Sequence, residues 1–216
     1  SLVSERTSEL FQSNQLLALN QQRLNQELQL AHDMQQALLP QRFPRSNQFN
    51  LYAAMNPAQE MGGDFYDCFE LENGHYALLV ADVAGKGIAS AFFMAISSTL
   101  IKQASAKHIE PHLVLKLANE WLCQRNPQNL FVTVFYAVFN PATLMLQYAN
   151  AGHHSGLLLS ESDKIQALES PPQLPLGAWE GIEYSSHHVT LNPNDCVVLY
   201  TDGITEALSQ TEQEYG

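Results

Sequence analysis

Basic residues are scarce in this chain. Of its 216 residues, 10 are Lys or Arg against 22 Asp or Glu, which gives a formal net charge of −12. Nucleic acids and anionic membranes are bound through basic surfaces, so this balance argues against either as the main partner. Long apolar runs are also lacking, since none reaches the roughly 18 residues of a membrane-spanning helix. We therefore expect no nucleic acid and no membrane among the partners.

Cysteine is rare as well. The three cysteines, Cys68, Cys123 and Cys196, are odd in number and far apart. This pattern fits neither a disulfide framework nor a zinc site, and the N-terminus lacks the basic and then apolar layout of a signal peptide. We expect a cytoplasmic protein in which each cysteine is a small buried apolar residue.

Glycine and proline are absent from residues 5–39, where Gln, Leu, Asn and Glu dominate. Every seventh position there is apolar, as in one line of a heptad repeat, and companion positions such as Asn14 are mostly polar. The line consists of Leu10, Leu17, Leu24, Ala31 and Leu38. The pattern predicts a helical, coiled-coil-like linker over residues 1–40, ended by Pro40. It favours a helix that forms a homodimer or carries a signal, and packing against its own domain is the alternative.

The segment 41–216 has the pattern of a layered domain. Apolar residues alternate with period two in most of it, and Asn73-Gly74 is a strong hairpin signal. Helical spacing is found at 88–101 and 111–123, and the first of these segments is apolar on nearly all faces, as in a helix buried on a sheet. We expect strands at 50–58, 64–71, 76–83, 130–139, 144–149, 156–159, 182–191 and 195–200. This order indicates an α+β fold with a mostly antiparallel sheet.

Three aspartates share one setting in the predicted sheet. Asp64 opens a strand after two glycines, while Asp82 and Asp202 close apolar strands shortly before a glycine. Each alone is explained by an ordinary turn. Together, without a matching Arg or Lys, three carboxylates at strand ends would repel, and a divalent cation is the simplest charge that reconciles them. Oxygen ligands favour magnesium or manganese over zinc.

A dinucleotide site is the first competing interpretation. The turn at 85–87 lies between a strand and a helix, as the glycine-rich turn of such a site does. However, Ser90 stands at the third glycine position, and Asp82 lies where a pyrophosphate would dock. Nucleotide binding is therefore the weaker hypothesis.

A serine hydrolase is the second competing interpretation. The run 152–156 (GHHSG) places Ser155 one position late for a nucleophile elbow. The histidine pairs at 153–154 and 187–188 are possible metal ligands, but adjacent residues on a strand point to opposite faces, so neither pair chelates as a unit. Structural or exposed roles are favoured for these histidines.

Short motifs along the chain together resemble a known family. They stand in order at 36–40 (QALLP), 62–67 (GGDFYD), 81–87 (ADVAGKG), 150–153 (NAGH), 175–177 (PLG) and 200–207 (YTDGITEA). In this combination the sequence is similar to the RsbU/SpoIIE branch of bacterial metal-dependent (PPM, protein phosphatase 2C-like) serine/threonine phosphatases. The resemblance covers about residues 38–215 and implies a PPM-type αββα β-sandwich flanked by helices.

The resemblance also implies a function. Members hydrolyse phosphoserine or phosphothreonine with two Mn²⁺ or Mg²⁺ ions, and their usual substrate is a phosphorylated anti-sigma-factor antagonist of a partner-switching signalling pathway. Their catalytic domain often follows a receiver or sensor domain through a helical linker. We thus expect the output domain of a response regulator in a two-component system. The alternative is a catalytically silent adaptor that binds a regulator or sigma-factor antagonist.

Roles for particular residues follow from the resemblance. Asp82 would bridge both metals, with the carbonyl of Val83 as a further ligand, Asp202 would bind the second metal, and Asp64 would hold metal-bound water. A water activated between two cations attacks phosphorus, so no side-chain nucleophile is needed. Lys86 is near these residues in sequence and is the candidate contact for the substrate.

The sequence departs from the family pattern near its end. The family continues with another helix and a strand that carries an Asp-Asp pair, a further metal ligand. Nothing after Asp202 fits that pair, because Glu206, Glu212 and Glu214 come too soon. We therefore expect a phosphatase domain at 41–216 that is C-terminally incomplete, with weak metal occupancy and low activity.

Overall fold

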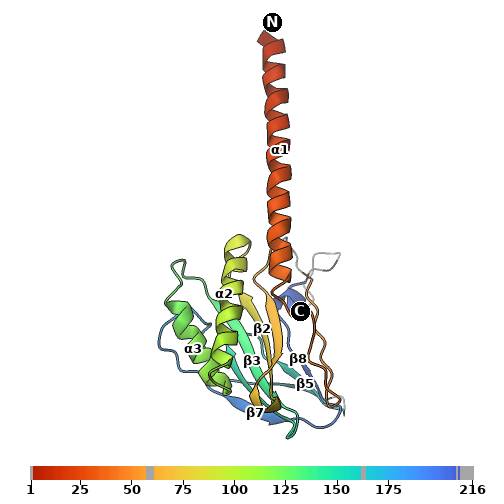
Figure 1. Cartoon of the computed structure of the whole chain (residues 1–216), viewed down its shortest axis with the longest axis vertical. Coiled ribbons are helices and arrows are strands. Elements are labelled where there is room, and N and C mark those ends of the chain that lie inside the picture. Colours follow the sequence, from red (N-terminus) through yellow and green to blue (C-terminus); the bar gives the residue numbers. More distant parts are fainter. Residues whose placement is uncertain (1, 57–60, 162–163, 208, 210–216) are drawn as a thin grey trace.

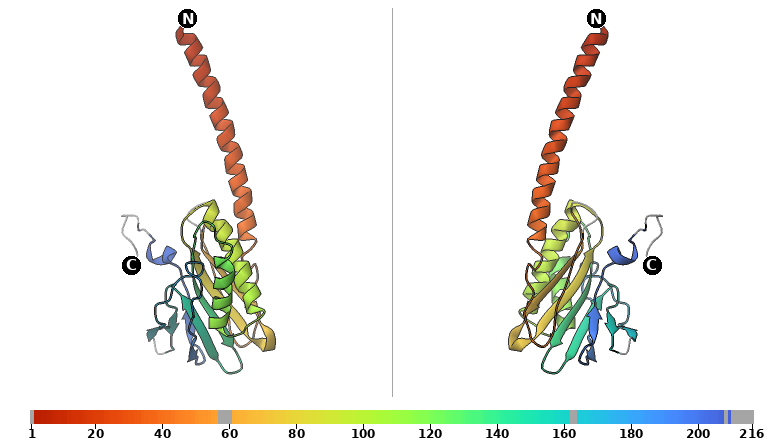
Figure 2. Two further views of the ribbon diagram at one scale, coloured as in Figure 1. Left: turned by 90° about the vertical axis from the view of Figure 1, so that its left-hand side faces the viewer. Right: turned by 90° about the vertical axis from the view of Figure 1, so that its right-hand side faces the viewer.

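The long N-terminal helix stands apart from the rest of the molecule. The structure, a computed structural model, describes residues 2–56, 61–161, 164–207 and 209. Helix α1 (Leu2–Gln36) projects away from a layered domain, as Figures 1 and 2 show. The leucines at heptad positions Leu10, Leu17 and Leu24 are exposed, so the helix does not pack along its length on its own domain. No helix in the described part of the chain combines the length and the apolar character needed to cross a membrane.

The domain is built on two antiparallel sheets. The larger has the strand order β1-β2-β3-β4-β7 and the smaller the order β6-β5-β8. The larger consists of β1 (Phe65–Glu70), β2 (Tyr76–Val83), β3 (Val132–Asn140), β4 (Met145–Ala151) and β7 (His187–Thr190). The smaller consists of β5 (Leu157–Leu159), β6 (Ile165–Ala167) and β8 (Cys196–Val198). Helices α2 (Ile88–Ser105) and α3 (Pro111–Cys123) lie on the larger sheet, which confirms the predicted α+β fold (Figure 1).

Strand β3 is buried on both faces, which explains its continuous apolar sequence. On one face Val134 and Tyr136 belong to a core shared with α2 and α3. On the other, Phe135 and Phe139 belong to a second core that includes residues of the smaller sheet. The order of layers is thus helices, larger sheet, smaller sheet, and β3 is central to both cores.

The predicted hairpin between β1 and β2 is confirmed. The two strands pair antiparallel from Phe65↔Ala81 to Glu70↔Tyr76. A short 3₁₀ turn, η1 (Glu72–Gly74), joins them, and both Asn73 (φ 59°) and Gly74 (φ 72°) are left-handed. Asn-Gly tolerates this pair of positive φ angles better than other dipeptides, so the sequence signal and the geometry have one cause.

The predicted strand at 50–58 is wrong over its described part. Residues 50–56 form no strand, although half-buried and exposed side chains still alternate there, and residues 57–58 lie outside the described residues. The ring of the preceding Phe49 packs against Tyr76 and Phe139, at centroid distances of 4.7 and 5.5 Å. The period-two pattern therefore reflects side-chain packing of an extended segment without ladder hydrogen bonds.

The structure differs from the sequence predictions at several smaller points. The strand expected at 182–191 is confined to β7, and the three-residue strand β6 was not predicted. In α2 the side chains of Ile88 and Phe92 are exposed, because the sheet and α3 cover only part of its circumference. Cys68 is buried as expected, but Cys123 is half-buried and Cys196 is exposed.

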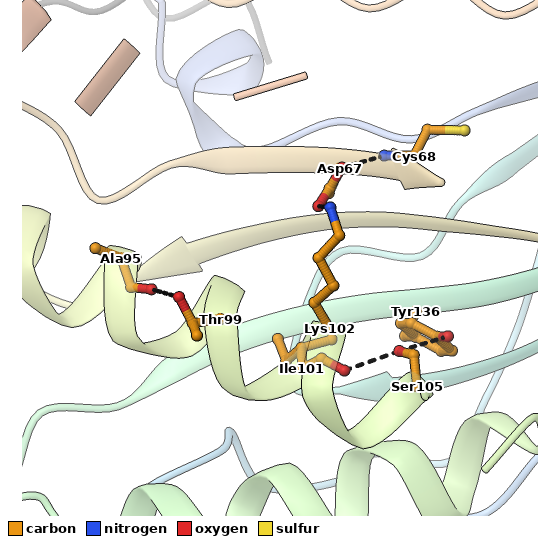
Figure 3. A network of polar contacts seen from close by, with 8 residues as sticks. All are labelled: Asp67, Cys68, Ala95, Thr99, Ile101, Lys102, Ser105 and Tyr136. Atoms are coloured by element: carbon orange, nitrogen blue, oxygen red, sulfur yellow. Dashed lines mark hydrogen bonds and ion pairs between the residues drawn. The ribbon is translucent and has the colours of Figure 1, made fainter. Parts of the chain in front are cut away.

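A polar network fastens α2 to β1 (Figure 3). Lys102 Nζ lies 3.1 Å from Asp67 Oδ2, and the other oxygen of this buried carboxylate accepts a hydrogen bond from Cys68 N at 2.8 Å. The ammonium group also lies 4.7 Å from the centre of the Phe69 ring. One turn further, Ser105 Oγ accepts a hydrogen bond from Tyr136 OH at 2.9 Å. The helix is thus held at two points, by the exposed Lys102 to β1 and by the buried Ser105 to β3.

Removal of the Lys102 charge is expected to destabilise the domain. In Lys102→Met the Asp67 carboxylate stays buried without its ion pair, so we expect the free energy of unfolding to fall by about 1–3 kcal/mol. Urea denaturation measures the change. The double variant Lys102→Met/Asp67→Asn should recover most of the loss, since an uncharged amide still accepts from Cys68 N. Equal stability of Lys102→Met and the parent chain would show that the pair contributes nothing.

Candidate metal centre

The structure brings the three predicted aspartates together. Asp64 directly precedes β1, Asp82 is the last residue but one of β2, and Asp202 opens the short helix α4 (Asp202–Thr205) after β8. One carboxylate oxygen from each lies within 4.8 Å of the others, and all three residues are half-buried. Two carboxylates therefore come from the larger sheet, and the third from the chain that follows the smaller sheet.

Close packing of Gly63 against the end of β2 places Asp64 in this group. A Cβ atom on Gly63 would lie 2.6 Å from the Val83 carbonyl oxygen and 3.0 Å from Val83 Cβ, whereas one on Gly62 would meet nothing within 4 Å. Glycine is thus required at position 63 by space. The same contact brings the Val83 carbonyl, a predicted metal ligand, beside the backbone that leads to Asp64.

The carboxylates repel one another strongly. Burial, a hydrogen bond with Asp64 and the negative charges of Asp64, Asp202 and Glu206 raise the pKa of Asp82 from 3.8 to about 8. In the metal-free chain one carboxyl group of the cluster therefore keeps a proton near neutral pH. Glu206, which the sequence analysis did not count as a metal ligand, adds to the negative charge that raises the pKa of Asp82.

The donor set fits a divalent cation. Two of the aspartates border an open cavity of about 180 Å³, which is lined by Asp82, Thr133, Gly152, His153, His154 and Asp202. This lining contains no Lys or Arg, so no side-chain ammonium or guanidinium group in it neutralises the aspartates. A magnesium or manganese ion would offset the repulsion and suits oxygen ligands.

Lys86, the predicted substrate contact, lies outside the lining of this cavity. Its side chain is exposed in the turn after β2, between Gly85 (φ 97°) and Gly87 (φ 81°). Ser155 does not line the cavity either, and the lining holds no serine or cysteine. The described lining thus offers no serine or cysteine nucleophile, and Thr133 is its hydroxyl-bearing side chain.

Hydrogen bonds between distant segments hold the site together. Thr201 Oγ1 donates to Asp64 Oδ2 at 2.6 Å, across 137 positions of sequence. His153 contacts Thr133 Oγ1 through Nδ1 at 2.8 Å and the Tyr200 carbonyl through Nε2 at 3.0 Å. Sequence reasoning missed Thr133 and Thr201, because threonine in a strand or before a helix has many ordinary explanations. For His153 the NAGH motif was the available signal.

The two histidine pairs differ in their setting. His187 and His188 lie on β7 with alternating exposure, as expected for a strand, whereas His153 and His154 follow the end of β4 and their ring centroids are only 5.8 Å apart. His153 is buried, while His154 is exposed and its ring stacks on Tyr200 at a centroid distance of 5.5 Å. Burial lowers the pKa of His153 to about 4, so this ring is neutral at physiological pH. His187 is half-buried beside the Tyr148 ring and His188 is exposed. In neither pair are both rings buried together.

Comparison with known proteins identifies the family. The family model described as stage II sporulation protein E (SpoIIE) matches residues 72–216. Phosphoserine phosphatase RsbU of Bacillus subtilis (strain 168) is 31% identical over 200 residues, which cover 93% of this chain and 59% of RsbU. This chain therefore spans less than two thirds of that relative.

Solved structures share the fold. The SiaA-PP2C domain of Pseudomonas aeruginosa superposes with a TM-score of 0.74 at 22% identity, over 91% of this chain and 79% of that one. The RsbU and RsbW domains of Rv1364c from Mycobacterium tuberculosis match with a TM-score of 0.62 at 26% identity, over 72% of this chain and 42% of that one. The family match and the shared layered fold lead to one conclusion: the chain belongs to the SpoIIE family of PP2C-type phosphatase domains.

Proposed function

We propose that this chain is the catalytic part of a metal-dependent phosphoprotein phosphatase that acts on phosphoserine or phosphothreonine. The observation that carries the proposal is that one carboxylate oxygen each of Asp64, Asp82 and Asp202 lies within 4.8 Å of the others. The adjoining cavity is lined by Asp82 and Asp202 but by no Lys or Arg. Two Mn²⁺ or Mg²⁺ ions are the proposed cofactors. The name of RsbU, a phosphoserine phosphatase, supports the same chemistry.

The residues of the chain have distinct proposed roles in catalysis. Asp82 and Asp202, with the Val83 carbonyl, would hold the cations, and Asp64 would orient water beside them. When bound, the ions neutralise phosphoryl oxygens and make water a stronger nucleophile near neutral pH. Thr201 fixes the Asp64 carboxylate by its hydrogen bond, and the open cavity admits a phosphorylated side chain. Lys86, exposed nearby in sequence, remains the proposed contact for the substrate protein.

The proposed substrate is a phosphorylated anti-sigma-factor antagonist of a partner-switching pathway in the cytoplasm. The likeness to RsbU and to the structure that joins RsbU and RsbW domains supports it. The test is release of phosphate from candidate phosphorylated antagonists, with Mn²⁺ and with EDTA. We expect turnover with Mn²⁺ and none with EDTA. Tight binding of a phosphorylated partner with no turnover under either condition would favour the adaptor function instead.

The domain organisation proposed is a linker at 1–40, joined to an upstream receiver or sensor domain, and a phosphatase domain at 41–216. A contact between the C-terminal end of α1 and the loop before Asp64 supports a linker that is coupled to the metal centre. The buried side chain of Gln35 donates from Nε2 to the Gly62 carbonyl at 2.6 Å, and its Oε1 accepts from Gly62 N at 3.4 Å. Gly62 stands two residues before Asp64. A change in the position of the helix would therefore shift the backbone that leads to the metal centre.

Helix α1 is expected to form a homodimer with a second copy of itself. Its exposed heptad line offers a narrow apolar stripe that pairing would bury. In sedimentation velocity, a chain that begins at Gln41 should therefore run as a smaller species than the whole chain, by more than the loss of mass explains. The same association state for both chains would contradict the prediction.

A further inference from the structure

His153 connects the two sheets at the metal centre. It follows β4 of the larger sheet, and its Nδ1 contacts Thr133 on the neighbouring strand β3. Its Nε2 contacts the carbonyl oxygen of Tyr200, which follows β8 of the smaller sheet. The ring is buried, and its own backbone is held by Asn150, which accepts from His153 N at 2.7 Å and donates to His153 O at 2.8 Å. The imidazole is therefore held in place through the backbone of His153 and through both ring nitrogens.

The partners determine which nitrogen of the ring carries hydrogen. A carbonyl oxygen only accepts, so Nε2 carries the hydrogen and donates it to Tyr200 O. In the neutral ring Nδ1 is then an acceptor, and the Thr133 hydroxyl donates to it. The same hydroxyl lies 3.4 Å from the Asp82 carbonyl oxygen, a longer contact than the 2.8 Å to Nδ1. The donors and acceptors are thus assigned along the chain: the Thr133 hydroxyl donates to His153 Nδ1, and His153 Nε2 donates to the Tyr200 carbonyl oxygen.

This chain of hydrogen bonds ends beside aspartates on both sides. Thr133 is the residue of β3 that pairs with Asp82 on β2. Tyr200 stands two residues before Asp202, and the residue between them, Thr201, donates to Asp64. The imidazole thus links the backbone beside Asp82 in the larger sheet to the backbone beside Asp202 after the smaller sheet, in addition to the bond between Thr201 and Asp64. We infer that His153 and Thr133 are positioning residues that set the spacing of Asp82 and Asp202 and thereby the affinity for the cation.

Two other roles agree less well with these contacts. A metal-ligand role for His153 needs a free nitrogen lone pair, but Nε2 carries hydrogen and Nδ1 accepts from Thr133. A nucleophile role for Thr133 would need the ring as its base, but burial lowers the pKa of His153 to about 4, which makes it a weak base near neutral pH. Positioning accounts for both contacts at once. The inference rests on the proposed metal centre.

The test measures Mn²⁺ affinity by isothermal titration calorimetry on the metal-stripped whole chain. Thr133→Val keeps the shape of the side chain and removes the hydroxyl, and His153→Phe removes both ring hydrogen bonds. Residues that orient a metal's ligands typically change affinity by ten- to a hundredfold when replaced, so we expect the dissociation constant to rise by about tenfold or more in each. Thr133→Ser and His153→Gln, which retain a donor, should recover part of the loss.

His187→Phe is the matched control. That half-buried ring contacts Ser185 Oγ and the Tyr148 ring, neither of which lines the cavity, so Mn²⁺ affinity should be unchanged. Melting followed by circular dichroism in EDTA separates folding from metal binding. If His153→Phe fails to fold, the Thr133→Val and Thr133→Ser pair decides the question.

The outcomes distinguish this inference from the proposed function. Weaker Mn²⁺ binding in Thr133→Val, with recovery in Thr133→Ser, supports positioning even if the parent chain hydrolyses no phosphoprotein. Unchanged Mn²⁺ affinity in Thr133→Val overturns it even if the parent chain is an active phosphatase. Unchanged affinity with complete loss of turnover would identify Thr133 as a nucleophile and overturn it as well.

Discussion

Asp82→Asn is expected to reduce Mn²⁺-dependent hydrolysis of a phosphoserine substrate by a factor of about 10³, the scale of losing a main electrostatic group of a reaction site. The reason is the central place of this carboxylate, which interacts with both Asp64 and Asp202. An amide at this position has the same shape but no charge, so the cluster loses its attraction for a second cation. Initial rates over a range of Mn²⁺ concentrations measure the effect, because weaker binding alone is restored at high Mn²⁺.

The same substitution is expected to stabilise the metal-free chain. The pKa of Asp82 is raised from 3.8 to about 8 in the folded state, so the folded chain binds this proton more tightly than the unfolded chain. Its contribution to stability is therefore present below about pH 4 and is lost as the pH rises toward 8. In EDTA at pH 8 the melting midpoint of Asp82→Asn should exceed that of the parent by about 2–4 °C, the equivalent of about 1 kcal/mol after allowance for screening at a half-exposed site.

Asp67→Asn is the matched control for both effects. Asp67 is buried, pairs with Lys102 and lies outside the cavity, so its loss should leave turnover unchanged and lower the stability. A loss of turnover with a gain of stability in Asp82→Asn, and the reverse pattern in Asp67→Asn, would distinguish a carboxylate that binds a cation from one that stabilises the fold. Full turnover in Asp82→Asn would rule out the proposed mechanism.

How much of this architecture was predictable depends on the range of the contacts. The β1–β2 hairpin was predicted because its signals, alternating apolar residues and Asn73-Gly74, act on neighbours in sequence. Helix α3 was predicted with its observed bounds for the same reason, since Pro111 begins it and helical spacing continues to Cys123. The segment 50–56 was misread, because alternation reports which side chains pack and not which backbone groups pair.

The candidate site shows the same division. That Asp64, Asp82 and Asp202 stand at strand ends is a local property of the sequence. Their shared setting and charge predicted a cation site, and the resemblance to a family assigned each its role. The contacts that hold the group join residues far apart in sequence, such as Thr201 with Asp64 and His153 with Tyr200. A hydroxyl or an imidazole acquires such a role only when two sheets meet, so no pattern within one segment of the chain indicates it.

Gly63→Ala is expected to damage both stability and metal binding. The added Cβ would lie 2.6 Å from the Val83 carbonyl oxygen and 3.2 Å from Val83 N, so backbone atoms must move apart. Overpacking of this kind costs about 1–3 kcal/mol. The displaced groups are a proposed ligand carbonyl and the chain that leads to Asp64, so turnover should fall by about 10² as the reacting groups shift. Denaturation in EDTA and rates with Mn²⁺ measure the two effects.

Gly62→Ala is the control, one position earlier in the same loop. A Cβ atom there meets nothing within 4 Å, and the hydrogen bonds of Gly62 with Gln35 use only backbone groups of the glycine. Alanine at position 62 should thus leave stability within about 0.5 kcal/mol of the parent and turnover unchanged. If both variants lose activity equally, conformational freedom of the loop matters more than the contact with Val83. If Gly63→Ala keeps full Mn²⁺-dependent turnover, the close approach of Gly63 to Val83 is no part of the metal centre.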